Sequence, residues 1–185
     1  MHHPLRHAFG LAILAACAAA PSAAPAGFVE DPLAAPGPVV LIFVRTDCPI
    51  ANRYAPTIAE LASEHQARGV RFVLVYPDDD ATPAVIDAHR EAFGHALAAL
   101  RDPRHDWVAK TGVGVTPEVA VYDAERRPVY RGRIDDRFPM PGVARIEPLE
   151  RDLDRVLDAL ERGERLEFTT QPAIGCPIPT LDAHR

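Results

Sequence analysis

The apolar residues of this chain follow two different spacings, which together predict an alternation of strands and helices. Short, nearly continuous apolar runs are typical of strands buried on both faces, and they occupy residues 39–44, 70–76, 119–122 and 128–132. Apolar residues three and four positions apart are typical of one buried helix face, and they predict helices over 49–68, 83–93, 105–111 and 149–160. This order of elements predicts an α/β layer fold with a central sheet.

Several residues define the predicted helices more closely. Gly69 is expected to end the first helix, and Pro56 is expected to kink it. Thr82 is expected to cap the second helix, with Pro83 in its first turn. The last helix has one apolar face, formed by Leu149, Leu153, Val156, Leu157 and Leu160. Residues 164–185 show no periodicity, so a tail without regular structure is expected there.

The N-terminal segment has the pattern of an export signal. A short start that carries Arg6 precedes an apolar stretch over residues 8–16, which is shorter than the roughly 20 residues that a membrane span needs. Leu14-Ala15-Ala16-Cys17 is similar to a bacterial lipobox, in which the cysteine is lipidated and becomes the mature N-terminus. This similarity predicts a signal peptide over residues 1–16 and a lipid on Cys17. Cleavage by ordinary signal peptidase near residues 20–26 is the alternative.

Both forms of processing place the protein outside the cytoplasm. We expect an exported protein of the bacterial periplasm or cell envelope, held at the membrane by a lipid anchor only. A disulfide can persist in such a compartment. The rest of the chain is expected to consist of an Ala/Pro/Gly-rich linker with nothing to pack over residues 17–36, one folded domain over 37–162 and a C-terminal tail over 163–185.

Composition restricts the function classes. The chain has 185 residues, of which 48% are hydrophobic and 25% charged, as suits one globular domain. A net charge of −6 provides no basic surface for nucleic acid, so no nucleic-acid partner is expected. Three cysteines are too few for a disulfide-dense scaffold, so each one is interpreted separately. No cofactor or bound metal is expected.

Cys48 stands at the junction between the first predicted strand and the first predicted helix. Backbone N–H groups at the start of a helix lack partners within the helix, and they favour the thiolate form of a cysteine placed there. Because the thiolate is the nucleophilic form, this location indicates redox or nucleophilic chemistry. The structural alternative is a small buried apolar side chain.

The segment from Phe43 to Pro56 resembles the active-site junction of thioredoxin, F-x-A-x-W-C-G-P-C-K-x-x-x-P. The resemblance covers residues 36–162 and implies a three-layer fold with a central mixed β-sheet flanked by helices. It places Cys48 on the nucleophilic cysteine of that family, Ala51 on the second cysteine and Pro56 on the kinking proline. Thr116-Pro117 resembles the cis-proline loop that faces the active cysteine.

A closer resemblance is to exported redoxin-domain proteins of the AhpC/TSA type. Their pattern S/T-x-C-P-I-x-N-x-Y-x-P is similar to residues 46–56, which contain a single-cysteine CPIA site. Their Y-R-G-R-I-D motif is similar to residues 130–135, and their terminal A-x-G-C motif to residues 173–176. This resemblance implies a redoxin and leaves its reaction open.

Departures from these patterns limit what the resemblance implies. Ala51 replaces the second cysteine of the CxxC pair, so Cys176 is the candidate resolving cysteine in the mature domain. The peroxiredoxin pattern P-x-x-x-T-x-x-C is not matched, because its threonine falls on Arg45 when the motif is aligned on Cys48. Thr46 is the nearest equivalent, and the candidate arginines for a peroxide-activating site are Arg45, Arg53 and Arg133.

Other polar clusters have a functional and a structural interpretation. The acids Asp78, Asp79 and Asp80 could form a metal site, but a solvated turn before a helix is favoured. The cluster after the fourth predicted strand is either an anion site or a salt-bridged loop, and it comprises Arg131, Arg133, Asp135, Asp136 and Arg137. Surface or satisfied polar roles are expected for His89, His95 and His105, and a core position is expected for Trp107.

Three function classes follow. The first is a thiol-disulfide oxidoreductase or peroxiredoxin-like protein with the candidate catalytic residues Cys48, Cys176, Thr46, Pro117 and Arg133. Its substrate would be a protein or small-molecule disulfide or a peroxide, and its electron donor an unidentified thiol. The second is a non-catalytic interaction module with a structural Cys48–Cys176 disulfide. The third is a copper-handling protein that resembles the Sco proteins, since two thiolates can bind Cu(I).

Overall fold

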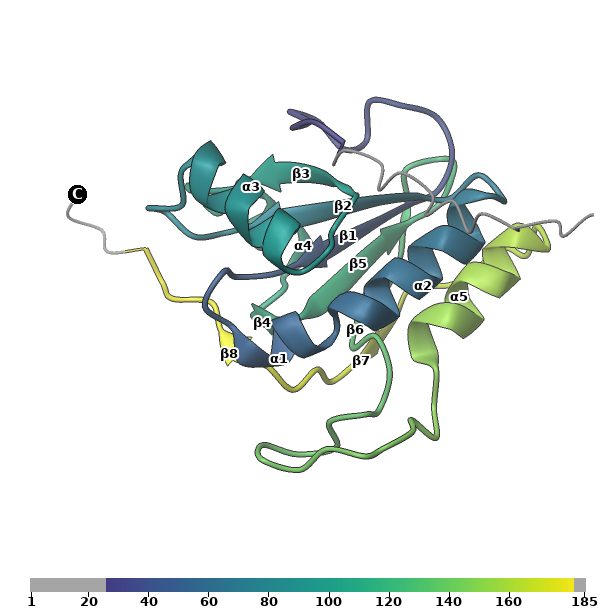
Figure 1. Ribbon diagram of the computed structural model, residues 1–185. Helices are drawn as coiled ribbons and strands as arrows, with labels where there is room; N and C mark the ends of the chain where they lie inside the picture. The colour runs from purple at the N-terminus through teal and green to yellow at the C-terminus, as the bar shows by residue number, and fades with distance from the viewer. Residues whose placement is uncertain (1–25, 182–185) are drawn as a thin grey trace, which may run out of the picture.

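The computed structural model describes residues 26–181, which form one mixed sheet with helices on both faces (Figure 1). The sheet has six strands in the order β3-β2-β1-β5-β6-β7. Its strands are β1 (Val39–Phe43), β2 (Arg71–Tyr76), β3 (Ala98–Arg101), β5 (Glu118–Tyr122), β6 (Pro128–Gly132) and β7 (Thr169–Gln171). A separate pair is formed by β4 (Val115–Thr116) and β8 (Cys176–Pro177). The helices are α1 (Pro49–Arg53), α2 (Ala55–Gln66), α3 (Pro83–Ala92), α4 (Asp106–Thr111) and α5 (Asp152–Glu161).

The strand directions make the sheet mixed. β1 runs parallel to β2 and β2 parallel to β3, whereas β5 is antiparallel to both β1 and β6. β7 extends the sheet parallel to β6. The predicted α/β fold with a central mixed sheet is therefore confirmed.

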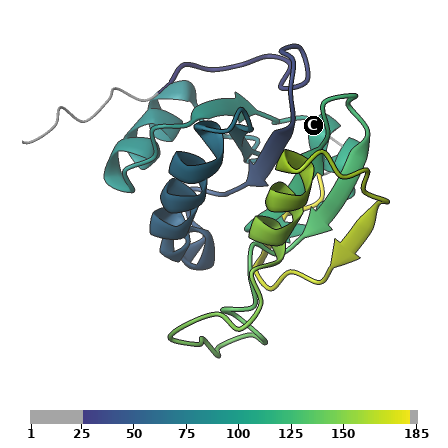
Figure 2. The same ribbon diagram turned by 90° about the vertical axis from the view of Figure 1, so that its right-hand side faces the viewer.

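Alternate residues of the central strands face two separate cores. Val40 and Ile42 of β1 pack with residues of α2 and α5 on one face of the sheet. Leu41 and Phe43 pack on the opposite face, where Trp107 of α4 contributes a half-buried side chain. Figure 2 shows α2 and α5 side by side over the first face. This arrangement gives three layers and explains why the central strands are apolar without alternation.

The first predicted helix is divided in two. Pro56 lies in the first turn of α2, and the chain breaks at Tyr54 between α1 and α2. Proline in a helix interior removes a hydrogen bond and clashes with the carbonyl four residues earlier, so the break falls just before it. α2 ends at Gln66, three residues before Gly69, whose φ is 92°. The expected kink is confirmed, and the predicted end at residue 68 was two residues too late.

The last predicted helix begins later than expected. α5 starts at Asp152, and Leu149 precedes it with 75% of its surface exposed. Leu153 and Leu157 are fully buried, and Val156 and Leu160 pack partly against the same core. Leu149 was therefore wrongly included in the buried face, because an apolar residue at helical spacing can also belong to the preceding loop.

Both segments that were predicted to be irregular contact the domain. Leu33, in the predicted linker, is only 8% exposed and joins the second core. Arg71 donates hydrogen bonds to the carbonyl groups of Pro32, Ala35 and Pro36. In the tail, β7 and β8 are strands that the sequence did not predict, and β3 was missed as well. The expectation of a linker with nothing to pack is wrong for residues 26–36.

The predicted signal segment and Cys17 lie outside the described residues. Within residues 26–181, every helix is too short or too polar to cross a membrane. The loop between β6 and α5 extends away from the body of the domain in both views (Figures 1 and 2). α1, β4 and β8 gather at one end of the sheet, and Cys48 is at the start of α1 (Figure 1).

Candidate functional site

The chain after β1 places Cys48 at the N-terminal cap of α1. The backbone N–H of Ala51 points at the Cys48 sulfur over 3.4 Å, and Pro49 begins the helix. The Cys48 side chain is completely buried. The location that the sequence predicted, at the N–H groups of a helix start, is confirmed.

A loop from the neighbouring strand faces this thiol. The Thr116–Pro117 peptide bond is cis, as predicted, and the Thr116 carbonyl accepts a hydrogen bond from the Cys48 thiol over 3.0 Å. The Thr116 hydroxyl is buried and has no hydrogen-bond partner among residues 26–181 at ordinary distances. It does lie close enough to the Cys48 sulfur to help lower the pKa of that thiol. The loop therefore presents a backbone acceptor to Cys48 and places a buried hydroxyl close to its sulfur.

The C-terminal tail covers the site. In the β4–β8 pair, Cys176 lies directly opposite Thr116, and the N–H of Ile178 donates to the carbonyl of Gly114 over 3.0 Å. A Cβ atom on Gly175 would lie 2.2 Å from the Thr116 carbonyl oxygen. Real Cβ atoms do not approach a backbone oxygen so closely, so glycine is required for the tail to reach this loop.

Both thiols lie at the Thr116 loop, and they differ in acidity. Burial by itself raises the pKa of Cys48, but a hydrogen bond from the Cys176 side chain, the contact with Thr116 and two backbone N–H groups lower it below its ordinary value. Burial, the hydrogen bond with Cys48 and the charge of Cys48 raise the pKa of Cys176 to about 11. The pKa of Cys48 is therefore displaced toward the thiolate and that of Cys176 toward the thiol.

Arg45 connects the strand–helix junction to the tail. Its Nε donates to Asp78 over 2.7 Å, one terminal nitrogen donates to Asp47 over 3.1 Å, and the other donates to the Pro177 carbonyl over 3.3 Å. Asp78 also accepts a hydrogen bond from the backbone N–H of Thr46, and its side chain is only 6% exposed. The interpretation of residues 78–80 as a solvated turn is therefore wrong for Asp78.

Thr46 and Arg133 are not joined to this thiol pair by any hydrogen bond within the described part of the chain. Thr46 uses its backbone, through Asp78 and through the amide of Asn52. The Arg133 guanidinium forms an ion pair with Asp152 over 2.6 Å, at the start of α5. Sequence spacing could not show this, because Arg133 meets its partner only after the long loop returns.

The charged cluster around Arg133 is a salt-bridged loop. Asp135 accepts a hydrogen bond from the Tyr54 hydroxyl over 2.5 Å. Asp136 accepts from the backbone N–H groups of Leu149 and Glu150 and pairs with Arg145. Asp135 thus ties the loop between β6 and α5 to the break between α1 and α2, and Asp136 closes the loop on itself. These contacts favour the structural interpretation of the cluster.

Of the histidines named from the sequence, His89 and His95 are buried, and the half-buried His105 lies 2.8 Å from the Pro77 carbonyl. His89 bridges the Asn52 side-chain carbonyl, over 2.9 Å, and the Tyr76 hydroxyl, over 3.0 Å. Because Asn52 also binds the Thr46 carbonyl, this bridge supports the segment that carries Cys48. Burial lowers the pKa of His89. Burial, together with the nearby charges of His89 and Arg90, lowers the pKa of His95 to about 4.

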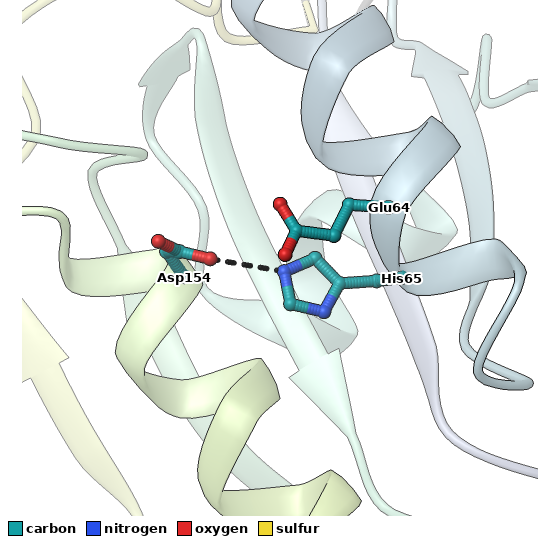
Figure 3. Close-up of side chains that lie close together, drawn as sticks. All are labelled: Glu64, His65 and Asp154. Atoms are coloured by element: carbon teal, nitrogen blue, oxygen red, sulfur yellow. Dashed lines mark hydrogen bonds and ion pairs between the residues drawn. The ribbon is translucent and has the colours of Figure 1, made fainter.

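His65 was not singled out from the sequence, yet its ring is fully buried between α2 and α5. Its Nδ1 faces Glu161 over 2.6 Å and its Nε2 faces Asp154 over 3.0 Å, as Figure 3 shows for Asp154. With Glu64, Asp154, Asp158 and Glu161 it forms the groups of residues 26–181 that could hold a cation, and neither cysteine belongs to them. Arg68 pairs with Glu64 and Glu161 there, so the cluster is an ion-pair joint between the two helices.

Comparison with known proteins agrees with this geometry. The described fold is similar to a hypothetical protein from Sinorhizobium meliloti, with 27% identity, a TM-score of 0.66, and coverage of 77% of this chain and 79% of that one. It is also similar to an uncharacterized conserved protein from Geobacillus kaustophilus, with 25% identity, a TM-score of 0.68, and coverage of 80% and 79%. An uncharacterized thioredoxin-like protein from Porphyromonas gingivalis shares the fold at 21% identity and a TM-score of 0.53, covering 70% of this chain and 78% of that one.

None of the curated proteins matches the chain in sequence. The family model described as Redoxin matches residues 32–141, which is more than half of the chain and includes β1, Cys48 and the cis-proline loop. The three-layer fold, the cysteine at the start of α1 and this match lead to one conclusion: the chain belongs to the redoxin family and has a thioredoxin-like fold.

Proposed function

We propose that the protein is a thiol-disulfide oxidoreductase in which Cys48 is the nucleophile and Cys176 is the resolving cysteine. One observation carries the proposal: beside the cis Thr116–Pro117 bond, Cys176 pairs with Thr116, the residue whose carbonyl accepts the hydrogen bond of the Cys48 thiol. The pKa values of the two thiols are also displaced in opposite directions. A pair with this asymmetry supports an ordered reaction, since the more acidic thiol attacks first.

In the first step, the Cys48 thiolate attacks one sulfur of a substrate disulfide. A mixed disulfide forms on Cys48, the other substrate sulfur leaves as a thiolate, and this thiolate takes a proton from the solvent or a nearby thiol. The Ala51 N–H and the Thr116 hydroxyl are the groups placed to stabilise charge on the Cys48 sulfur before attack.

In the second step, the Cys176 thiolate attacks the Cys48 sulfur. The Cys48–Cys176 disulfide forms and the remaining substrate sulfur leaves as a thiolate, so the substrate gains two electrons and the protein dithiol loses them. Once Cys48 is in a mixed disulfide, it no longer carries the charge that raises the pKa of Cys176. The Ile50 N–H, which lowers that pKa, then favours the Cys176 thiolate. An external thiol donor would reduce the disulfide again.

Peroxide is the other candidate electron acceptor for Cys48. The residues considered for peroxide activation, Thr46 and Arg133, have their hydrogen bonds to Asp78, Asn52 and Asp152 instead. We therefore assign no catalytic step to Thr46 or Arg133, and disulfide exchange is better supported than peroxide reduction.

We propose that Pro117 shapes the surface against which both thiols lie, because the Gly175 backbone approaches the nitrogen of Pro117.

A permanent staple is the second candidate function of the cysteine pair. The complete burial of Cys48 favours it, because a thiol that the tail always covers would be inert. A copper-handling role has less support, since among residues 26–181 the groups with metal-ligand geometry lie around His65 and include neither cysteine.

We also propose that the protein is exported and anchored by a lipid on Cys17. The support is the short apolar stretch over residues 8–16 and the lipobox-like sequence that follows it. An exported location would allow a Cys48–Cys176 disulfide to persist. Metabolic labelling of the full chain with a radiolabelled fatty acid, with Cys17→Ser as the control, tests the anchor. Equal labelling of both chains would exclude it.

Mass spectrometry of the oxidised chain, followed by its redox equilibrium with glutathione, tests the proposed function. We expect a Cys48–Cys176 peptide that disappears on reduction, and a reduction potential in the range of exchanging disulfides. Absence of that peptide would exclude Cys176 as the resolving cysteine. A potential below about −300 mV would identify a structural staple instead of a redox-active bond.

A further inference from the structure

Arg45 is placed to hold the resolving segment against the nucleophile. Its guanidinium belongs to the junction between β1 and α1, three residues before Cys48, and it contacts the tail at the Pro177 carbonyl, one residue after Cys176. The side chain is 19% exposed, so the group is neither free in solvent nor part of the core. A planar guanidinium can donate in several directions at once, and Arg45 uses three of its N–H directions.

Asp78 fixes the direction of this guanidinium. Its carboxylate, at the end of β2, receives the Arg45 Nε over 2.7 Å and the Thr46 N–H over 3.3 Å. Both donors belong to the segment that leads to Cys48. Two of the three Arg45 contacts therefore anchor the side chain to the domain, and the third reaches across to the tail.

Beyond Cys176 the tail has few other attachments of this kind. Pro179, Thr180 and Leu181 border an open cavity of about 480 Å³, and Arg45 and Asp78 line its other side. Residues 179–181 thus lie beside a cavity, whereas Ile178 packs against the second core. The polar contacts that hold Cys176 in place are the Arg45–Pro177 hydrogen bond, the pairing of β8 with β4 and the Ile178–Gly114 hydrogen bond. Arg45 provides the one contact among these that comes from a side chain.

We infer that Arg45, oriented by Asp78, is a positioning residue that latches the Cys176 segment over Cys48. This inference rests on the proposed function, because it assigns the latch to the exchange between these two thiols. While the latch is closed, Cys48 is buried and Cys176 is within reach of it. When the latch opens, Cys48 is uncovered for substrate and Cys176 is moved away from it.

The latch predicts opposite effects on the two chemical steps. Attack by Cys48 on a substrate requires an open tail, so weakening the latch accelerates it. Resolution by Cys176 requires a docked tail. The substrate half of a mixed disulfide on Cys48 already competes with the tail for this position, so weakening the latch slows resolution. Losing a hydrogen bond from a charged group changes the docking equilibrium by about tenfold. General damage to the fold would not produce this pair of opposite changes.

The test uses the reduced full-length chain with Cys17→Ser, so that Cys48 and Cys176 are its only cysteines. One equivalent of 4,4′-dithiodipyridine is added, because this neutral disulfide is not attracted or repelled by the charge of Arg45. Attack by Cys48 releases one 4-thiopyridone and leaves a mixed disulfide, and attack by Cys176 on Cys48 releases the second and forms the intramolecular bond. Stopped-flow absorbance follows both phases. For Arg45→Met, which keeps an apolar stem and lacks the guanidinium, we expect a first phase about tenfold faster and a second about tenfold slower.

Arg104→Ala is the matched control, since Arg104 borders the same cavity, is 82% exposed and pairs with Asp106. In this variant, the rates of both phases should equal those of the unmodified chain. Asp78→Asn should shift the two phases in the same directions as Arg45→Met. Unchanged phases in Arg45→Met, or two phases that slow together, would overturn the latch. If the unmodified chain releases only one 4-thiopyridone, the proposed function itself fails, which is a separate outcome.

Discussion

Replacing Gly175 by alanine should uncover Cys48 while leaving the rest of the domain folded. The added Cβ would lie 2.2 Å from the Thr116 carbonyl oxygen and 2.7 Å from its carbon, and both are backbone atoms that cannot rotate away. The tail must shift, which costs about 1–3 kcal/mol as overpacking. It also weakens the pairing of β8 with β4 and the Ile178–Gly114 hydrogen bond, each worth about 1 kcal/mol.

If both contacts are lost, the docking of the tail should weaken by about 3–5 kcal/mol, which corresponds to a factor of about 150 to 4,000. The assay is the rate of iodoacetamide alkylation of Cys48 in a Cys176→Ser background, where no intramolecular disulfide can form. Because the docked tail buries Cys48, alkylation requires opening, and its rate should rise by that factor up to the limit of an exposed thiolate.

Gly114→Ala provides a matched control in the same part of the molecule. A Cβ on Gly114 would meet nothing within 4 Å, so its alkylation rate should remain that of the parent. Thermal unfolding of both variants checks that the domain is intact. If Gly175→Ala and Gly114→Ala are alkylated at the same rate, the close approach of the tail to the cis-proline loop does not control access to Cys48, and the reasoning is refuted.

Three further predictions concern acidity and packing. The midpoint of Cys48 alkylation against pH should be higher in Cys176→Ala than in Cys176→Ser, because only the serine hydroxyl can replace the hydrogen bond that favours the thiolate; equal midpoints would exclude that bond as a cause. His95 has a pKa lowered from 6.5 to about 4, so the unfolded chain binds its proton first and stability should fall as pH decreases through this range, by up to about 3 kcal/mol. His95→Gln should remove this part of the pH dependence in urea unfolding measurements, and an unchanged slope would contradict the assignment. Arg71→Ala removes three hydrogen bonds to the segment 26–36 and should make it cleavable by limited proteolysis. A segment as resistant as before would show that its other contacts, such as the buried Leu33 and the Val29–Ala99 backbone hydrogen bond, hold it without Arg71.

The sequence by itself determined the features that depend on near neighbours along the chain. The apolar runs of β1 and β2 identified strands buried on both faces, because such runs fit no exposed element. Pro56 predicted the break between α1 and α2, since proline acts on the turn directly before it. The place of Cys48 at a helix start followed from the same local reading. The cis bond before Pro117 came from the family resemblance, because local sequence only makes such a bond possible.

Only the tertiary structure decided what depends on partners far along the chain. β7 is three exposed polar residues without periodicity, and it becomes a strand because β6 offers an edge and Gly132 leaves room for Gln171. Asp78 reads as part of an acidic turn, and it is buried because Arg45 and the Thr46 N–H meet it there. A buried charge is set by its partner in space, which no window of sequence contains.

The pairing of Cys48 with Cys176 shows the same division. The sequence supplied the two cysteines and the absence of a second one at Ala51, which made Cys176 a candidate. Gly175 lies against the Thr116 peptide, and this close approach brings the thiols together. The order in which they ionise then follows from burial and from the hydrogen bonds that each sulfur receives, which exist only in the folded chain.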